Sequence, residues 1–498
     1  MYLLGLDIGS SSIKAAIIDA ESGLSITSGF YPEQEMPIAA PKPGFAEQDP
    51  EMWWEYTKLA IKKTVMNAGI SSKDIRAVGI SYQMHGLVMV DNKHNVISPS
   101  IIWCDSRATG IGDIAFNEIG KEKCLSHLLN SPGNFTASKL KWVKDKQPEL
   151  FSRIYKIMLP GDYIAMKLTG EIRTTASGLS EGILWDFKKE EIADIVLDYY
   201  GIDPSFLPEL VPVFSEQGSI TKEVSSDTGL AVGTPVAYRA GDQPNNAFSL
   251  NVLNPGEIAT VAGTSGVVYG VSDEIKYDPE SRINTFLHVN HSEKNNSLGV
   301  LLCINGTGLL NSWSRSNMAG QLTYDQMNKE ASDIKIGSEG LIILPFGNGA
   351  ERMLGNISYG SRICNLDFNI HSRKHFYRAA HEGIAFAFRY GIDIMKNLGI
   401  KPDIVRAGYG NMLLSPVFRN TLSNITGAII ELYNTDGSQG AARAAGLGAG
   451  IYKSYDEAFR GLALVMQTEP DHDKRNEYNK AYENWLIELN NYIKNSLT

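Results

Sequence analysis

Short apolar runs separated by small and polar residues recur along the chain and predict buried strands joined by tight turns. The chain opens with such a pair, because residues 3–6 and 13–18 are mainly apolar and flank an Asp-Ile-Gly-Ser-Ser-Ser turn at 7–12. The pattern returns at 255–269, where two apolar runs flank a small-residue turn at 263–265. One hairpin of the same design in each half predicts a duplicated architecture whose halves face each other across a ligand.

Helical and strand patterns alternate between and after the hairpins. Asp49, Pro50 and Glu51 place a cap, a proline and an acidic residue where a helix begins, and this helix is expected to end near Ala68. Further strands are expected at 75–80, 234–240 and 403–407, and further helices from Ser415, from Gly437 and over 477–493. The small residues of the helix from Gly437 favour close packing on a sheet. The chain is therefore of the α/β class.

Length and composition limit the kind of protein. A chain of 498 residues exceeds one hydrophobic core, so two domains are expected, at 1–247 and 248–498. The net charge of −10 disfavours sequence-independent binding to nucleic acid. The four cysteines are scattered and indicate neither a disulfide scaffold nor a zinc site. No apolar run reaches membrane-spanning length, and Asp7 interrupts the first one, so we expect a cytoplasmic protein without a signal peptide.

The first turn has the composition of a phosphate-binding site. Gly9 permits tight curvature, so that amide N–H groups and the hydroxyls of Ser10, Ser11 and Ser12 can converge on an oxyanion. Asp7 would repel a phosphate directly and is better suited to hold a divalent cation or its water. An ordinary hairpin with a solvated aspartate is the alternative.

Three expected strands end in polar residues, and ligands of α/β sheets collect at such ends. His85 follows the strand at 75–80, Asp105 follows the apolar residues 101–103, and Asp242 follows the strand at 234–240. A carboxylate there could accept the proton of an attacking hydroxyl, which makes Asp242 the candidate base. Each residue has a structural alternative. His85 could be hydrogen-bonded to the backbone, Asp105 could form an ion pair with Arg107, and Asp242 could cap the following helix.

The second half contains glycine-bearing loops after its apolar runs. Gly408 and Gly410 follow the strand at 403–407 and would let adenosine approach the backbone, while Gly306 follows another apolar run. The chain has no Walker A sequence, and Leu413 occupies the third position of a G-x-G-x-x-G fingerprint, so neither a P-loop nor a dinucleotide fold is favoured. The G-x-S-x-G match at 178–182 lacks a buried strand before it and is set aside as a hydrolase motif.

Successive segments of this chain resemble landmarks of the FGGY carbohydrate kinases. The segments are Asp7–Ser11, Glu47–Pro50, Trp53-Trp54, Gln83–Gly86, Trp103–Asp105, Asn134–Leu140, Leu159–Tyr163 and Leu168–Glu171. Gln-Met-His-Gly at 83–86 is similar to the xylulose kinases within that family. The similarity continues to within a few dozen residues of the C-terminus.

The resemblance implies two actin-like, ribonuclease H-like domains with ATP and Mg²⁺ in the cleft between them. It implies that Asp242 is the base, that Asp7 and Asp242 hold the metal, and that a ketose, D-xylulose phosphorylated on its 5-hydroxyl in pentose catabolism, is the acceptor. Sugar contacts are expected from Met84, His85, Asp105, Asp242 and Gln243. Nucleotide contacts are expected from Gly9, Ser10, Ser11, Ser12, Lys14, Gly263, Thr264, Ser265, Gly306, Gly408, Gly410 and Asn411. A monomer or a homodimer is expected.

The chain departs from the family pattern at a few positions. Gln243 stands where xylulose kinases often have Asn, Tyr409 interrupts a run of glycines, and Ala350 separates Gly349 from Glu351. Glu351 and Arg352 are interpreted as structural. The alternatives are an FGGY kinase for ribulose, fuculose, gluconate or glycerol, a degenerate kinase acting as a sugar sensor, and an actin-like nucleotide-binding protein without a sugar substrate.

Overall fold

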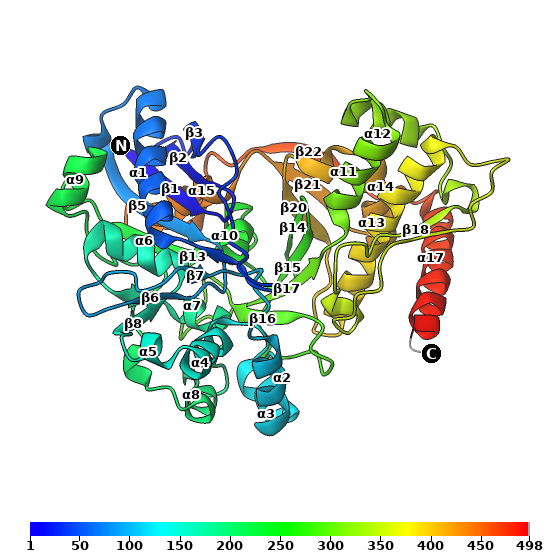
Figure 1. Cartoon of the computed structure of the whole chain (residues 1–498). Coiled ribbons are helices and arrows are strands. Elements are labelled where there is room, and N and C mark those ends of the chain that lie inside the picture. The colour runs from blue at the N-terminus through cyan, green and yellow to red at the C-terminus, as the bar shows by residue number, and fades with distance from the viewer. Residues whose placement is uncertain (497–498) are drawn as a thin grey trace.

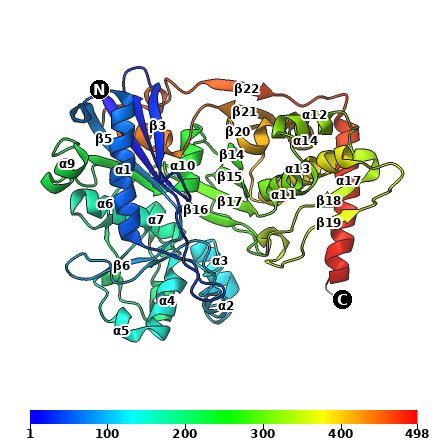
Figure 2. The same cartoon turned by 45° about the horizontal axis from the view of Figure 1, so that its top comes forward.

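The computed structural model describes residues 1–496, which form two α/β halves side by side (Figures 1 and 2). The N-terminal sheet has the strand order β13 (Val236–Gly241), β5 (Ile75–Tyr82), β1 (Tyr2–Ile8), β2 (Ile13–Asp19) and β3 (Ser25–Tyr31). The C-terminal sheet has the order β16 (Asn284–Leu287), β17 (Leu298–Ile304), β15 (Gly266–Ser272), β14 (Ile258–Ala262), β20 (Ile404–Gly408), β21 (Ile429–Tyr433) and β22 (Leu464–Thr468).

The two sheets repeat one core arrangement. The order β3-β2-β1-β5-β13 in the first corresponds to β17-β15-β14-β20-β21 in the second. In each, the first strand of a hairpin pairs antiparallel with the second strand and parallel with a later one: β1 with β2 and β5, and β14 with β15 and β20. The structure thus confirms the duplication predicted from the two hairpins.

Side chains alternate between the two faces of β1, as the strand period requires. Leu4, Leu6 and Ile8 belong to a core that includes Trp53 and Ile61 of α1 (Pro50–Ala68). Leu3 points to the other face and packs with alanines of α15 (Gly437–Gly448). Asp7 lies on this second face, where the carboxylate approaches the first residue of α15.

The helix α15 follows the strands of the C-terminal half but packs on the N-terminal sheet, where it appears orange among blue strands in Figure 1. A Cβ on Gly5 would lie 1.8 Å from the Ser438 carbonyl oxygen, and one on Gly79 would lie 2.0 Å from that of Ala441. The close packing predicted for this helix is therefore confirmed. Glycine on the strands and small residues on the helix allow the two backbones to approach so closely.

The other helices cover the sheets or extend the N-terminal half. They include α2 (Thr109–Glu118), α3 (Lys121–Leu128), α4 (Thr136–Lys146), α6 (Pro160–Thr169), α7 (Ala176–Glu181), α10 (Asp242–Ser249), α11 (Thr307–Met318), α12 (Tyr324–Ser332), α13 (Arg373–Lys396), α14 (Pro416–Thr426) and α17 (Arg475–Ser496). The predicted helices from residues 50, 415 and 437 begin where expected. Within residues 1–496, no helix has both the length and the apolar character needed to cross a membrane.

Candidate functional site

Three parallel strands of the N-terminal sheet end at one edge and bring the predicted polar residues together. The register pairs Asp7 of β1 with Ser81 of β5, and Gly241 of β13 with Tyr82. Asp242, which begins α10, therefore lies at the same edge as Asp7 and the turn that follows β5. A cavity of about 320 Å³ opens there, with Asp7, Lys14, Asp242 and Gln243 on one side. Its other side is formed by C-terminal residues that include Gly408, Gly410, Asn411 and Asp436.

Burial disfavours the ionisation of both carboxyl groups of this cavity. Burial raises the pKa of Asp242 to about 7, and the negative charge of Asp7 adds to the rise. Burial also raises the pKa of Asp7, while Lys14 opposes that rise with its Nζ 3.8 Å from Asp7 Oδ2. The Ser81 hydroxyl donates to Asp7 Oδ1 at 2.9 Å. A carboxylate with a pKa near neutrality is suited to accept a proton from a substrate hydroxyl.

The pair of carboxylates fits a hydrated divalent cation better than a cage made by protein alone. Within residues 1–496, no group of three or more His, Cys, Asp or Glu side chains is arranged to hold a metal ion. Magnesium keeps several waters and is usually bound through one or two carboxylates together with substrate phosphates. Asp7 and Asp242, on one cavity and with raised pKa values, have the chemistry for this role.

A second cavity, of about 480 Å³, continues the first into the C-terminal half. The two share Ala262 and Asn411, and the second is also lined by Gly263, Thr264 and residues of α11 and α12. The turn of the second hairpin is fixed to α11, because the amides of Gly308 and Leu309 donate to the carbonyls of Gly263 and Thr264. Together the cavities form a continuous path from Asp242 to the C-terminal half.

The turn of the first hairpin is held largely by the chain around it. The Gly9 amide donates to the carbonyls of Asp7 and Ser12, which leaves it engaged within the turn. The Ser10 carbonyl accepts from Gln48 Nε2 at 2.7 Å, and the Ser11 carbonyl accepts from the Met36 amide. From this hairpin, Asp7 and Lys14 line the cavity.

Gly306 lines a mainly apolar cavity with Trp313 and Phe376, and this cavity shares Leu309 with the second one. A Cβ on Gly306 would lie 1.6 Å from the Pro345 carbonyl oxygen, so close packing of two loops accounts for the glycine.

His85 occupies the turn after β5 with a left-handed backbone (φ 62°). Its Nδ1 lies 2.9 Å from the carbonyl oxygen of Glu181 in α7, and its ring contacts Phe135 edge to face. Burial, with the nearby charge of Lys139, lowers the pKa of His85 to about 3, so the ring is neutral. A carbonyl oxygen only accepts hydrogen bonds, so Nδ1 carries the proton. The lone pair of Nε2 can then accept a hydrogen bond from a hydroxyl group.

The other residues expected to contact the sugar differ in the partners that they have in the structure. Met84 lies against Gly241, the residue before Asp242, because a Cβ built on Gly241 would lie 2.7 Å from Met84 Cγ. Asp105 is buried and accepts hydrogen bonds from Arg107 and from the Ala46 amide, which corresponds to the ion pair weighed from the sequence. Gln243 Oε1 is buried without a hydrogen-bond partner among the described residues.

Four buried polar atoms on the segments that carry these candidates have no hydrogen-bond partner within the described part of the chain: Gln83 Oε1, Asn134 Oδ1, Glu181 Oε1 and Gln243 Oε1. Unpaired buried atoms also occur elsewhere in the described residues, so these four are available to a polar ligand but do not mark the site by themselves.

Asp436 lines the first cavity and was not predicted, while Arg352 and Glu351 were interpreted as structural. Asp436 follows β21, caps α15 by accepting from the Gln439 amide, and raises the pKa of Asp7. Its place at a strand's end was a usable signal. Arg352 extends from the C-terminal half to within 3.5 Å of Ser131 Oγ in the N-terminal half, and also donates to the Ser281 carbonyl. Glu351 accepts from the Asn305 amide.

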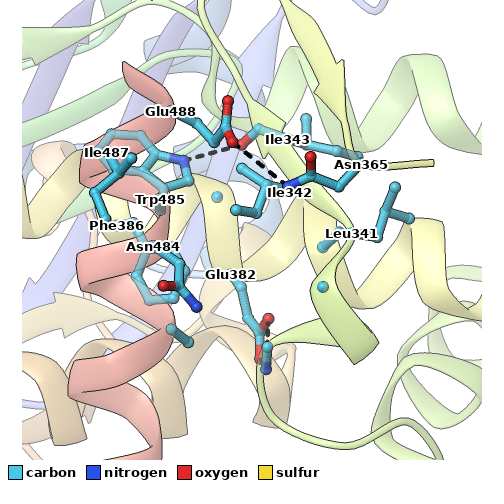
Figure 3. A pocket seen from close by; sticks show the side chains of 15 residues that line it. Leu341, Ile342, Ile343, Asn365, Glu382, Phe386, Asn484, Trp485, Ile487 and Glu488 are labelled. Carbon is cyan, nitrogen blue, oxygen red and sulfur yellow. Dashed lines mark hydrogen bonds between the residues drawn. The ribbon is translucent and has the colours of Figure 1, made fainter. Parts of the chain in front are cut away.

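Two other features lie outside this site. Ser180, in the G-x-S-x-G match, belongs to a short helix, where its hydroxyl donates to the Ser177 carbonyl and accepts from the Leu287 amide. A crevice between α17 and β18 (Ile342–Leu344) is lined by Phe386, Trp485 and Glu488 (Figure 3). Its lining residues all belong to the C-terminal half and include none of the predicted site residues.

Comparison with known proteins gives the family context of this site. Residues 2–249 match the N-terminal domain of the FGGY family of carbohydrate kinases, and residues 258–449 match its C-terminal domain. The xylulose kinase of Bacillus subtilis (strain 168) is 29% identical over 465 residues, which cover 92% of this chain and 90% of that protein.

Two solved structures share the fold throughout. A ligand-bound xylulose kinase from Lactobacillus acidophilus has a TM-score of 0.89 at 23% identity, with 98% of each chain covered. A gluconate kinase from the same organism has a TM-score of 0.90 at 22% identity, covering 99% of this chain and 98% of that one. Because kinases named for different sugars fit almost equally well, the fold by itself does not select the acceptor.

Proposed function

Because the chain belongs to the FGGY family of carbohydrate kinases and is therefore an ATP-dependent sugar kinase, we propose that its acceptor is D-xylulose. The reaction transfers the γ-phosphate of ATP to the 5-hydroxyl, giving D-xylulose 5-phosphate, ADP and a proton. This product would enter pentose catabolism. The sugar assignment is supported by the xylulose kinase relative and by the Gln-Met-His-Gly segment at 83–86.

The observation that carries the proposal is the position of Asp242 between the His85 turn and the path into the C-terminal half. The sugar would lie against His85, whose Nε2 accepts a hydroxyl, while Gln243 supplies an unpaired acceptor beside the base. Asp242 takes the proton of the 5-hydroxyl as that oxygen attacks the γ-phosphorus in line.

Nucleotide and metal would occupy the remaining space of the two cavities. The phosphates would lie between the two hairpins, with adenosine toward Gly410, Asn411 and α11. Asp7 and Asp242 would hold Mg²⁺, which when bound offsets the charge of the phosphates. Lys14, half exposed at the cavity, adds a cation on the same side.

A panel of acceptors assayed with ATP and Mg²⁺ tests the substrate. ADP release coupled to NADH oxidation would be measured for D-xylulose, L-ribulose, L-fuculose, D-gluconate and glycerol. We expect kcat/KM to be highest for D-xylulose. Another acceptor that exceeds it by tenfold would overturn the sugar assignment and leave the kinase activity intact.

D-gluconate is the most informative competitor in this panel, since a gluconate kinase has a TM-score as high as the xylulose kinase. Gluconate carries a carboxylate, whereas D-xylulose is neutral, so the two acceptors make different electrostatic demands on the sugar side of the site. A preference for gluconate would contradict the sugar assignment.

A further inference from the structure

The turn that carries His85 and the loop that carries Trp103 and Asp105 are both held by one buried side chain, in addition to the backbone pairing of Leu87 with Ile101. Lys139, in the first turns of α4, is fully buried. Its Nζ donates to the carbonyl oxygen of His85 at 2.8 Å and to that of Ile102 at 3.0 Å. A single side-chain nitrogen thus contacts two different segments of the chain.

Neighbouring residues at the start of α4 reinforce the same two segments. The Asn134 side-chain amide donates to the Asp105 carbonyl, and the Thr136 hydroxyl donates to the Gly86 carbonyl at 3.4 Å. The Phe135 ring lies 4.8 Å from the His85 ring. Residues 134–139 therefore contact both loops and hold them in place.

Each loop carries one side chain of interest. His85 carries the Nε2 acceptor that the proposed function assigns to the sugar. Trp103, which follows Ile102, is 52% exposed and donates from its indole nitrogen toward the Ser10 hydroxyl in the first hairpin. The backbone of Leu87 pairs with that of Ile101, and the two bonds from Lys139 add to this pairing at the ends that carry His85 and Trp103.

We propose that Lys139 is a positioning residue for the sugar, which fixes the His85 turn against the Trp103 loop without touching substrate. The inference rests on the proposed function, because it takes the His85 turn as the place where the sugar binds. It explains why a lysine lies in an interior where an apolar residue of the same length would fill the space, since two buried carbonyl groups would otherwise lose their donors.

The positioning role of Lys139 does not require its amine to be charged. Burial lowers the pKa of Lys139 to about 7, with Arg107 contributing to the fall and Asp105, Cys104 and Glu181 opposing it. A neutral amine still has two N–H donors, which equals the number of carbonyl acceptors. We therefore expect the positioning to hold on both sides of neutral pH.

The test compares Lys139→Met with Lys141→Met, a matched control two residues along the same helix whose Nζ pairs with Asp145. Lys139→Met should raise KM for the sugar by about tenfold or more, because two hydrogen bonds that set the loop geometry are lost. The KM for ATP should stay within about twofold, and Lys141→Met should resemble the wild type. A sugar KM within twofold of wild type, or an equal rise in KM for ATP, would overturn the proposal.

Lys139→Gln separates positioning from simple packing and serves if Lys139→Met does not fold. Gln keeps one NH₂ group with two donors but is shorter, so its sugar KM should lie between those of the wild type and Lys139→Met. Sugar KM values that follow the thermal stability of the variants instead of their donors would contradict the proposal.

The outcome is separable from that of the proposed function. If the wild type phosphorylates a sugar other than D-xylulose, the substrate assignment fails while Lys139 is tested on that sugar.

Discussion

Replacing Asp242 by asparagine should make the protein more stable and nearly inactive at the same pH. In the folded chain the pKa of Asp242 is about 7, against an ordinary value of 3.8. Between these two pH values the folded state binds a proton that the unfolded chain has released. The free energy of unfolding therefore falls as pH rises through that window, and above it the ionised carboxylate costs about 4 kcal/mol. Asparagine has nearly the same shape and no charge, so the variant avoids this cost.

Differential scanning calorimetry at pH 5 and pH 8, without nucleotide or Mg²⁺, measures the effect. At pH 8 the transition that includes the N-terminal half should rise by about 2 °C or more for each kcal/mol recovered. At pH 5 the carboxyl is largely protonated in the folded state but ionised in the unfolded chain, so the gain from asparagine should shrink to about 1.6 kcal/mol, less than half of that at pH 8. The kcat at pH 8 should fall by roughly 10²–10⁴-fold, the range for loss of a general base.

Asp403→Asn, at an exposed position before β20, is the control and should change neither property. Equal stabilisation at both pH values, or none at pH 8, would mean that burial does not displace the pKa of Asp242. A kcat within threefold of wild type would refute its role as the base.

Three further substitutions test the site and the packing around it. Gly410 has extended backbone (φ 175°) and a Cβ there meets no atom within 4 Å, so Gly410→Leu should fold normally and raise KM for ATP about tenfold while the sugar KM stays unchanged. His85→Ala removes one hydrogen bond worth about 0.5–1.5 kcal/mol, so kcat/KM for the sugar should fall severalfold, and an unchanged value would exclude His85 from the sugar site. Gly5→Ala places a Cβ 1.8 Å from the Ser438 carbonyl and should lower the free energy of unfolding by about 3 kcal/mol or more, measured by urea titration; a neutral effect would contradict the close contact of β1 with α15.

The strongest periodic and capping signals predicted the elements that position the site. The Asp49 cap and Pro50 fixed the start of α1, and the alternation around residues 3–8 identified β1. Asp7 and Asp242 line one cavity, and it was the resemblance to the FGGY kinases that paired them in the sequence analysis. Asp7 lies near the end of β1 and Asp242 follows β13, and both strands run parallel to β5.

Features that depend on distant partners could not be predicted. The proton on His85 Nδ1 is determined by the Glu181 carbonyl, almost a hundred residues away. Lys139 lies in a helical stretch with other lysines, where a charged residue normally indicates an exposed face. For Gly306, the carbonyl oxygen of Pro345 that approaches it comes from a loop further along the chain.

The position of α15 has a consequence for how this protein is made. The helix that covers one face of the N-terminal sheet is encoded after residue 436, close to the end of the chain. During synthesis, β1, β5 and β13 leave the ribosome long before the surface that shields them exists. One face of the N-terminal sheet therefore stays exposed until nearly the whole polypeptide has emerged. A fragment ending near residue 249 would lack its own covering helix, and we expect it to aggregate unless the remaining segment is supplied in trans.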